Sequence, residues 1–136
     1  MDSLRYWAKR IGIDGFRFDL AATLARLDGE FTCYHPFLYA LRSDILLGNL
    51  KMIMEPWDCG PNGWRTGEFG IPFAEWNDRF RDCTRKFWLT DVDRTRSGEY
   101  GEMTMQDMAT RLCGSSDLFA TDPGRRSEER RVGKEC

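Results

Sequence analysis

Residues 13–20 read IDGFRFDL and alternate between apolar and polar positions with a period of two. The apolar positions are Phe16, Phe18 and Leu20, and the intervening positions are Gly15, Arg17 and Asp19. Successive side chains of an extended chain point to opposite faces, so this pattern predicts a strand. One of its faces would pack on helices, and its polar face would end in the carboxylate of Asp19.

A second strand is predicted over residues 51–55, KMIME, and Pro56 ends it because proline cannot donate to a ladder. A helix is predicted between the strands over residues 36–47, with Pro36 in its first turn and Gly48 at its end. The apolar stripe of this helix consists of Leu38, Leu41 and Ile45. Two strands joined by such a helix form a βαβ unit with parallel strands, so the sequence predicts an α/β fold.

Three further helices are predicted from apolar spacing and capping signals. Residues 2–11 form the first, which Asp2 or Ser3 can cap and Gly12 ends. Its stripe consists of Leu4, Trp7, Ala8 and Ile11. The second follows a stripe of Phe73, Trp76, Phe80, Cys83 and Phe87, which we assign to the core.

The third of these helices follows a capping box of Thr104 and Asp107, and Gly114 ends it. Its inward residues are predicted to be Met105, Met108 and Leu112. The stretches that predict loops are residues 58–72 and 91–103. Because the two predicted strands cannot bury their own faces, the sequence indicates the middle of a larger fold.

Composition excludes several functional classes. Apolar residues make up 41% and aromatic residues 13% of the 136 residues, which is typical of a globular protein. The net charge of −2 gives no basic surface for nucleic acid, and no apolar run reaches the roughly 18–20 residues of a membrane span. The 5 cysteines include no C-x-x-C pair, which favours reduced thiols and a cytoplasmic protein. We expect no metal and no cofactor, and a loop or surface role for the lone His35.

Each predicted strand ends in a carboxylate, Asp19 on the first and Glu55 on the second. In parallel α/β folds, polar residues at the carboxyl ends of strands gather at the active site. A pair of carboxylates is what glycoside hydrolysis uses, one at the sugar carbon and one on the leaving oxygen. The alternative interpretation is structural, in which the two acids cap helices or pair with Arg17.

The glycine-rich loop carries aromatic rings that can stack on sugars. Trp57, Trp64 and Phe69 lie in or beside it. For Trp64 and Phe69, ordinary packing within the loop explains the sequence equally well.

Several stretches resemble the α-amylase superfamily of glycoside hydrolases. IDGFRFDLA (13–21) resembles the motif at the end of that family's fourth barrel strand, and KMIMEPWDCG (51–60) resembles the motif on the fifth. DSLRYWAKRIGIDGFRFDLA, EPWDCGPNGW, AEWNDRFRD and GSSDLF together resemble the isoamylase-type bacterial glycogen debranching enzymes. The resemblance runs from about Asp2 to Arg125 and implies part of a (β/α)₈ TIM barrel that includes its strands 4 and 5.

The resemblance implies a role for each residue that matches a family motif. Asp19 matches the nucleophile and Glu55 the general acid, with Arg17 beneath the nucleophile. Trp57 and Asp58 match positions that shape the sugar-binding subsites. It also implies a retaining reaction, with carboxyl groups about 5–5.5 Å apart, on the α-1,6 branches of glycogen or its limit dextrin. The implied partners are α-glucans, with no nucleic acid and no membrane.

The chain departs from the family by what it lacks. The family's Asn-His motif is expected upstream of Met1, and its third catalytic carboxylate beyond Arg125. We therefore expect residues 1–125 to be a fragment of the catalytic barrel. Residues 126–136, RSEERRVGKEC, resemble the in-frame translation of a sequencing adapter, so we expect this tail to be non-native.

Two alternatives stay open at this point. The first is that the parent protein is another member of the superfamily, such as an isoamylase, a branching enzyme or a trehalose-forming relative. The 136 residues alone are expected to be an inactive remnant. Their open strand edges and exposed apolar surface also predict poor solubility.

Overall fold

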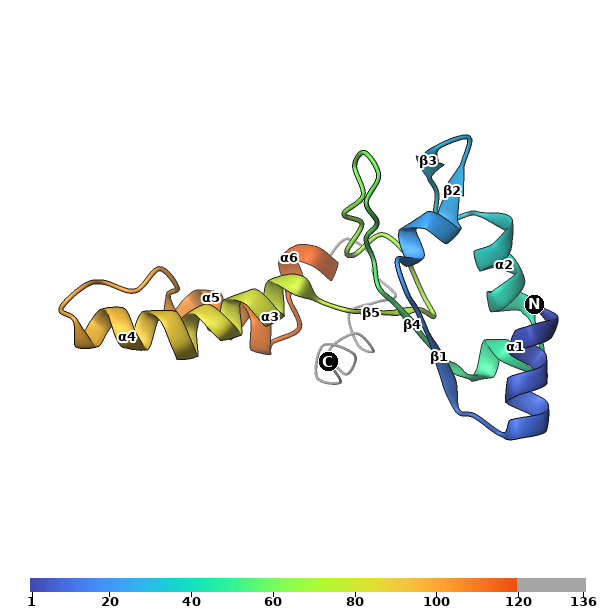
Figure 1. Ribbon diagram of the computed structural model, residues 1–136, viewed down its shortest axis with the longest axis horizontal. Helices are drawn as coiled ribbons and strands as arrows, with labels where there is room; N and C mark the ends of the chain where they lie inside the picture. Colours follow the sequence, from blue (N-terminus) through green and yellow to red (C-terminus); the bar gives the residue numbers. More distant parts are fainter. Residues whose placement is uncertain (120–136) are drawn as a thin grey trace. The chain divides into compact units, whose positions relative to one another are not determined.

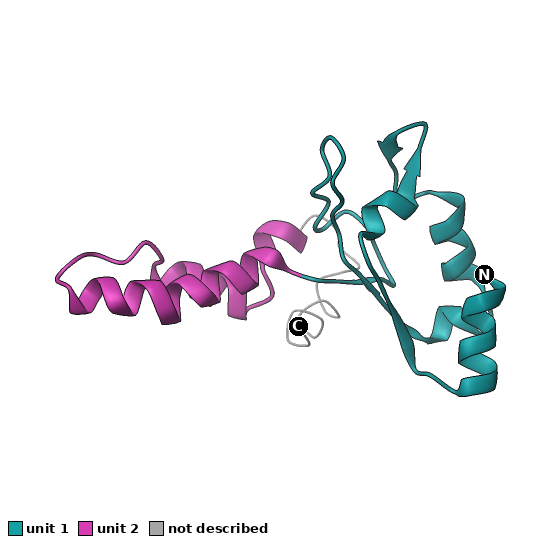
Figure 2. Cartoon of the chain, in the orientation of Figure 1, with its two compact units in different colours: residues 1–76 teal, residues 77–136 magenta. Residues whose placement is uncertain are grey.

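A computed structural model of the chain describes residues 1–119, and the predicted adapter-like tail at 126–136 lies outside them. The chain divides into two compact units, Met1–Trp76 and Asn77–Cys136 (Figure 2). Both strands that the sequence predicted lie in the first unit. No helix within the described residues is long and apolar enough to cross a membrane.

The first unit is built on a three-stranded parallel sheet (Figure 1). Its strands are β1 (Gly15–Phe18), β4 (Lys51–Met54) and β5 (Ala74–Glu75), in that spatial order. β1 and β4 pair from Gly15↔Lys51 to Phe18↔Met54, and β4 pairs with β5 through Ile53↔Ala74 and Met54↔Glu75. The predicted parallel pair is therefore confirmed, and the mixed helix and sheet content agrees with an α/β class.

Short helices and one hairpin complete the first unit. The helical segments are α1 (Asp2–Tyr6), the π-helix η1 (Trp7–Ile11), the 3₁₀ turns η2 (Ala21–Ala25) and η3 (Leu47–Asn49), and α2 (Pro36–Ser43). The hairpin pairs β2 (Arg26–Leu27) with β3 (Glu30–Phe31). Asp28 and Gly29 at its tip have φ of 50° and 86°, the two positive values that a type I′ turn requires.

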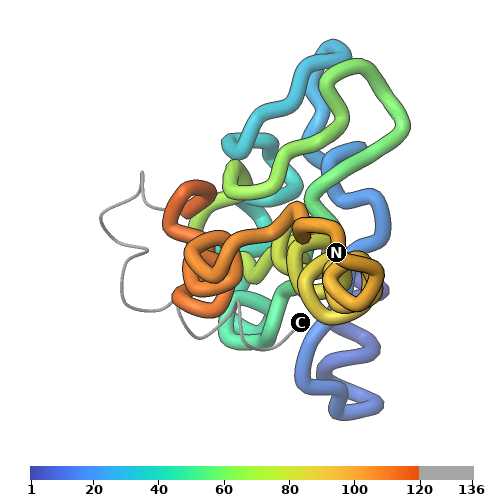
Figure 3. The backbone as a smooth tube through the Cα atoms, turned by 90° about the vertical axis from the view of Figure 1, so that its left-hand side faces the viewer, coloured from blue at the N-terminus to red at the C-terminus, as the bar shows by residue number. Residues whose placement is uncertain are grey.

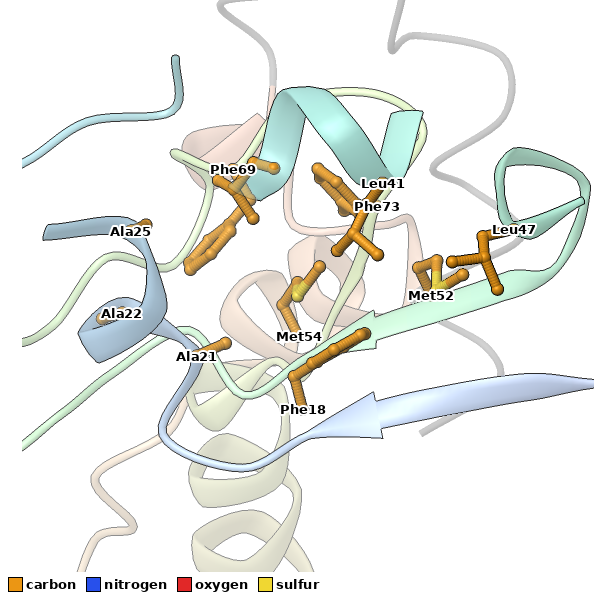
Figure 4. Close-up of a cluster of buried hydrophobic side chains, with 11 residues drawn as sticks. Phe18, Ala21, Ala22, Ala25, Leu41, Leu47, Met52, Met54, Phe69 and Phe73 are labelled. Carbon is orange, nitrogen blue, oxygen red and sulfur yellow. The ribbon is translucent and has the colours of Figure 1, made fainter. Parts of the chain in front are cut away.

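The core of this unit lies between the sheet and α2 (Figure 4). Phe18 of β1 and Met54 of β4 point to the same side of the sheet. Leu41 of α2 and Phe69 of the loop between β4 and β5 pack against them there. The other buried members are Ala21, Ala22, Ala25, Leu38, Leu47, Met52 and Phe73. Helices cover this face of the sheet, and Arg17 projects from the opposite face by the alternation of β1.

Three local predictions for the first unit are wrong. Ile45 is exposed, because α2 ends at Ser43 and the chain turns extended at Asp44 before η3. Neither Asp2 nor Ser3 caps α1, whose N-cap is Met1 without a side-chain bond. Trp7 and Ile11 are also exposed, so only Leu4 and Ala8 of that stripe pack against the core.

The largest correction concerns residues 73–77, which we predicted as the start of a helix. Ala74–Glu75 instead form β5, and the Trp76 N–H donates to the Met54 carbonyl at 3.0 Å. The carboxylate of Glu75 is buried and accepts the N–H groups of Gly67 and Phe69. The spacing of the apolar residues by three and four fits a helix, but hydrogen bonding to β4 makes these two residues a strand.

The second unit is helical. Its elements are α3 (Asp78–Arg85), the π-helix η4 (Lys86–Thr90), α4 (Asp91–Arg96), α5 (Met105–Leu112) and α6 (Ser116–Phe119). The predicted capping box of Thr104 and Asp107 is confirmed at the start of α5. α4 lies inside a stretch predicted as loop, because an acidic first turn and a basic last turn stabilise it without an apolar stripe. Met108 is buried, but Met105 and Leu112 are exposed, contrary to prediction.

Candidate active site

Asp19 and Glu55 lie at the same edge of the parallel sheet. Asp19 directly follows β1 and Glu55 directly follows β4, and the register pairs the preceding residues, Phe18 and Met54. The Glu55 N–H continues the ladder by donating to the Phe18 carbonyl at 3.0 Å. The two carboxylates predicted from the strand ends are thus brought together.

A single guanidinium joins the two acids. Arg17 donates from Nη1 to Oδ1 of Asp19 at 2.5 Å and from Nη2 to Oε1 of Glu55 at 2.9 Å. The Asp19 side chain is 71% exposed, whereas the Glu55 side chain is only 12% exposed. The pairing with Arg17 that we considered as a structural alternative is therefore present, and it also holds the two carboxylates side by side.

Glu55 has a second, backbone anchor. Its Oε2 accepts the N–H of Leu20 at 2.8 Å, and its backbone carbonyl accepts the N–H of Ala21 at 2.9 Å. Leu20 sits at φ 45° and ψ 47°, a left-handed conformation that costs a residue with a Cβ of order 1 kcal/mol or more. The turn after Asp19 is therefore shaped so that a backbone donor points at the neighbouring acid.

Trp76 is a site residue that the sequence analysis missed. The Arg17 guanidinium lies over its indole ring, with Cζ 4.2 Å from the ring centroid. We had assigned Trp76 to a helical core stripe, yet it lies just after β5 and is partly exposed. A strand predicted at 74–75 would have indicated this position for Trp76, since β5 adds a third strand end beside Asp19 and Glu55.

Trp57 and Asp58, the predicted subsite residues, begin the loop that follows Glu55. Trp57 is partly exposed, and its N–H donates to the Glu55 carbonyl at 2.9 Å. The Asp58 side chain is only 4% exposed, and Arg26 holds both of its oxygens, from Nε at 2.7 Å and from Nη2 at 2.9 Å. The Arg26 ion pair holds the pKa of Asp58 below its usual range.

The remaining candidates from the sequence are not part of this cluster. Phe69 is fully buried in the core, so the sugar-stacking interpretation of this ring is wrong. Trp64 is partly exposed in the same loop. The Nδ1 atom of His35 accepts the Phe37 N–H at 3.2 Å, which makes this histidine the N-cap of α2.

The arrangement offers two carboxylates of different exposure on one guanidinium, beside an indole ring. An exposed carboxylate can approach an electrophilic carbon, and a neighbouring one can exchange a proton with a leaving oxygen. No group of three or more His, Cys, Asp or Glu side chains among residues 1–119 could hold a metal ion. The two carboxylates of the cluster can together supply a nucleophile and a proton donor.

The amino-acid sequence that carries this site is similar to segments of known bacterial proteins. The chain is 47% identical over 119 residues to the glycogen debranching enzyme of Erwinia tasmaniensis, covering 88% of the chain and 16% of that protein. It is 44% identical over 119 residues to the glycogen debranching enzyme of Pectobacterium carotovorum, with the same coverage. For the enzyme of that name from Klebsiella pneumoniae strain 342, it is 44% identical over 124 residues, covering 91% of the chain and 17% of that protein.

No family model matches the chain. The similarity to these relatives nevertheless extends across both units, since 119 matched residues exceed the length of either one. The chain spans only about 16% of the length of the curated relatives that it matches. The 119 matched residues are therefore homologous to one segment of proteins named glycogen debranching enzyme.

Proposed function

We propose that this chain is part of the catalytic barrel of a retaining glycoside hydrolase that cleaves α-1,6 branches of glycogen and limit dextrin. The observation that carries the proposal is the pair of strand-end carboxylates, Asp19 and Glu55, on the single guanidinium of Arg17. The names of the homologues support glycogen as the substrate class.

The sheet supports a barrel origin. Its strands β1, β4 and β5 are all parallel and lie side by side in the order in which they occur along the chain, as successive strands of a (β/α)₈ barrel do. Helices cover one face (Figure 1), and Arg17 lies on the other by the alternation of β1. In a closed barrel the uncovered face would turn inward, and both acids would open at the carboxyl-terminal rim, where barrel enzymes carry their active sites.

The proposed reaction has two steps, and each carboxylate acts in both. Asp19 attacks the anomeric carbon and forms a glycosyl ester, while Glu55 gives its proton to the leaving oxygen of the branch. Glu55 then takes a proton from water, whose oxygen attacks the same carbon and releases Asp19. Arg17 holds the two carboxylates at one place, and Trp57 and Asp58 shape the surface that receives the sugar.

The test uses the complete gene product, obtained by sequencing the source DNA on both sides of this reading frame. We expect release of short linear maltooligosaccharides from limit dextrin. Asp19→Asn should lower turnover by several orders of magnitude without changing the melting temperature, because Asp19 is the exposed carboxylate. Near-wild-type turnover of Asp19→Asn would remove Asp19 from the nucleophile role.

The same experiment separates the related alternatives. An isoamylase would differ in the branch lengths that it releases, and a branching enzyme would transfer chains instead of releasing them.

We expect the 136-residue chain alone to be inactive. Its described residues leave large apolar side chains exposed, among them Trp7, Ile45, Trp88 and Tyr100. Measurable hydrolysis by this chain alone would contradict that expectation.

A further inference from the structure

Arg26, which the sequence analysis did not single out, has every terminal nitrogen engaged. Besides its two bonds to Asp58, Nη1 donates to the Gly29 carbonyl at 2.6 Å and Nη2 donates to the Pro61 carbonyl at 2.9 Å. A planar guanidinium that makes such a two-pronged contact with a carboxylate restricts the orientation of the two groups. Arg26 therefore fixes both the distance and the orientation of the segments that it joins.

The joined segments belong to the two loops that follow the two candidate catalytic acids. Residues 26–31 form the hairpin in the connection after Asp19, and residues 58–63 lie in the connection after Glu55. Both loops lie side by side at the top of the first unit in two perpendicular views (Figures 1 and 3). The Asp28-Gly29 dipeptide forms the tight turn of this hairpin, which places Arg26 at the start of its first strand.

The loop at 58–63 is packed tightly around the bound carboxylate. Asp58 Oδ1 also accepts the Gly60 N–H at 2.8 Å, and the Asp58 N–H donates to the Gly63 carbonyl at 3.0 Å. A Cβ atom at Gly63 would lie 2.3 Å from the Asp58 carbonyl oxygen. The shape of the loop therefore depends on Asp58, and Arg26 holds Asp58 by both carboxylate oxygens.

The position of Glu55 does not depend on the contact between Arg26 and Asp58. It is anchored by the Leu20 N–H and by Arg17, and its backbone continues the β1–β4 ladder. Trp57 lies between this anchored acid and the clamped Asp58, so releasing Arg26 frees the Trp57 side of the loop and leaves the acid fixed. We propose that Arg26 is a specificity-determining residue that positions the 57–63 segment to bind α-glucan. It would set substrate affinity and not the chemical step, an inference that rests on the proposed function.

The test measures KM and kcat of the complete gene product on limit dextrin. Arg26→Met should raise KM by about tenfold or more, because a binding segment that is no longer held in its bound conformation must be ordered when substrate binds, while kcat changes much less. Arg26→Lys keeps the charge but loses the fork and should fall in between. The matched control is Arg81→Met, since Arg81 makes a two-pronged contact with Asp82 that is exposed to solvent.

An unchanged KM in the Arg26 variants would overturn the proposal, whatever happens to kcat, because a purely structural defect lowers the amount of active enzyme and leaves KM as it was. Should Arg26→Met not fold, Arg26→Lys decides by the same criterion. Near-wild-type turnover by Asp19→Asn would contradict the proposed function itself. An inactive Asp19→Asn together with an unchanged KM would remove only the role of Arg26.

Discussion

The two units of the chain are stabilised by different means. In residues 1–76, a buried apolar cluster fills the space between a parallel sheet and α2. In the described part of the second unit, residues 77–119, the only buried hydrophobic side chains are Cys83 and Met108. Several large apolar side chains of that unit are exposed, namely Trp88, Leu89, Val92, Tyr100, Met105 and Leu112.

Polar contacts take the place of a core in the second unit. Buried Asn77 accepts the Phe80 N–H at 2.9 Å and donates to the hydroxyl of buried Ser115 at 2.8 Å. Buried Asp91 accepts the N–H groups of Glu102 and Met103 at 2.9 and 2.8 Å. Residues 77–119 are therefore ordered mainly by specific hydrogen bonds, whereas the first unit, which carries the candidate site, is ordered by burial of apolar side chains.

Two methionines test the comparison with the largest expected effect. Met54→Ala removes a fully buried side chain from the first unit and should cost about 2–5 kcal/mol of unfolding free energy. Met105→Ala changes a side chain that is 75% exposed in the second unit and should stay within about 0.5 kcal/mol. Urea unfolding of the 136-residue chain measures both, and equal losses would show that the two units do not differ in this way.

Asn77→Ala tests the polar contacts of the second unit. It removes the N-cap of α3 and leaves the Ser115 hydroxyl buried without this partner, so we expect a loss of about 1–3 kcal/mol. Amide hydrogen exchange should speed up in α3 and α5 and stay unchanged in β1 and β4. The control is Asn49→Ala, whose side-chain bond to the Ile45 carbonyl is exposed. Unchanged hydrogen exchange in α3 would contradict the stabilising role proposed for the hydrogen bonds of Asn77.

The second unit should also respond to acid through Asp91. Its bonds from the Glu102 and Met103 N–H groups lower the pKa of this carboxyl, whose unfolded value is about 3.9. The stabilisation is therefore complete above pH of about 4 and is lost as the pH falls further, because the unfolded chain then binds the proton first. In Asp91→Asn, hydrogen exchange of α4 should lose this acid dependence. Protection factors of α4 in the wild type that do not change below pH 4 would contradict it.

The smallest effect is expected from thiol modification, which leaves the fold intact. The four cysteines in the described residues are free, and burial raises the pKa of the Cys83 thiol. Exposed Cys59 in the first unit should therefore react with a disulfide reagent much faster than Cys83, as measured by mass spectrometry of native protein. Equal rates would mean that α3 opens on the timescale of labelling.

Local signals predicted the elements whose residues determine them without help. The strands at 15–18 and 51–54, the proline-started α2 and the Thr104–Asp107 capping box all follow from alternation, spacing or a capping motif. The sequence also predicted Asp19 and Glu55 as a pair, because parallel strands joined by one helix end at the same edge. The catalytic roles of these residues remain predictions.

Other features depended on partners distant in sequence. β5 exists because β4 offers it hydrogen bonds, and its apolar spacing alone fitted a helix equally well. Ile45, Met105 and Leu112 matched helical stripes yet are exposed, since no described residue covers them. The sequence contains no local sign that Trp76 would stack on Arg17 or that Arg26 would hold Asp58.

The sequence by itself determined which residues carry charge at the strand ends and which segments can be strands or helices, because these depend on neighbours a few positions away. Only the tertiary structure decided which charges meet. Arg17 reaches both acids, and Arg26 reaches across to Asp58, because pairing of β1 with β4 aligns their carboxyl ends and brings together loops more than thirty residues apart.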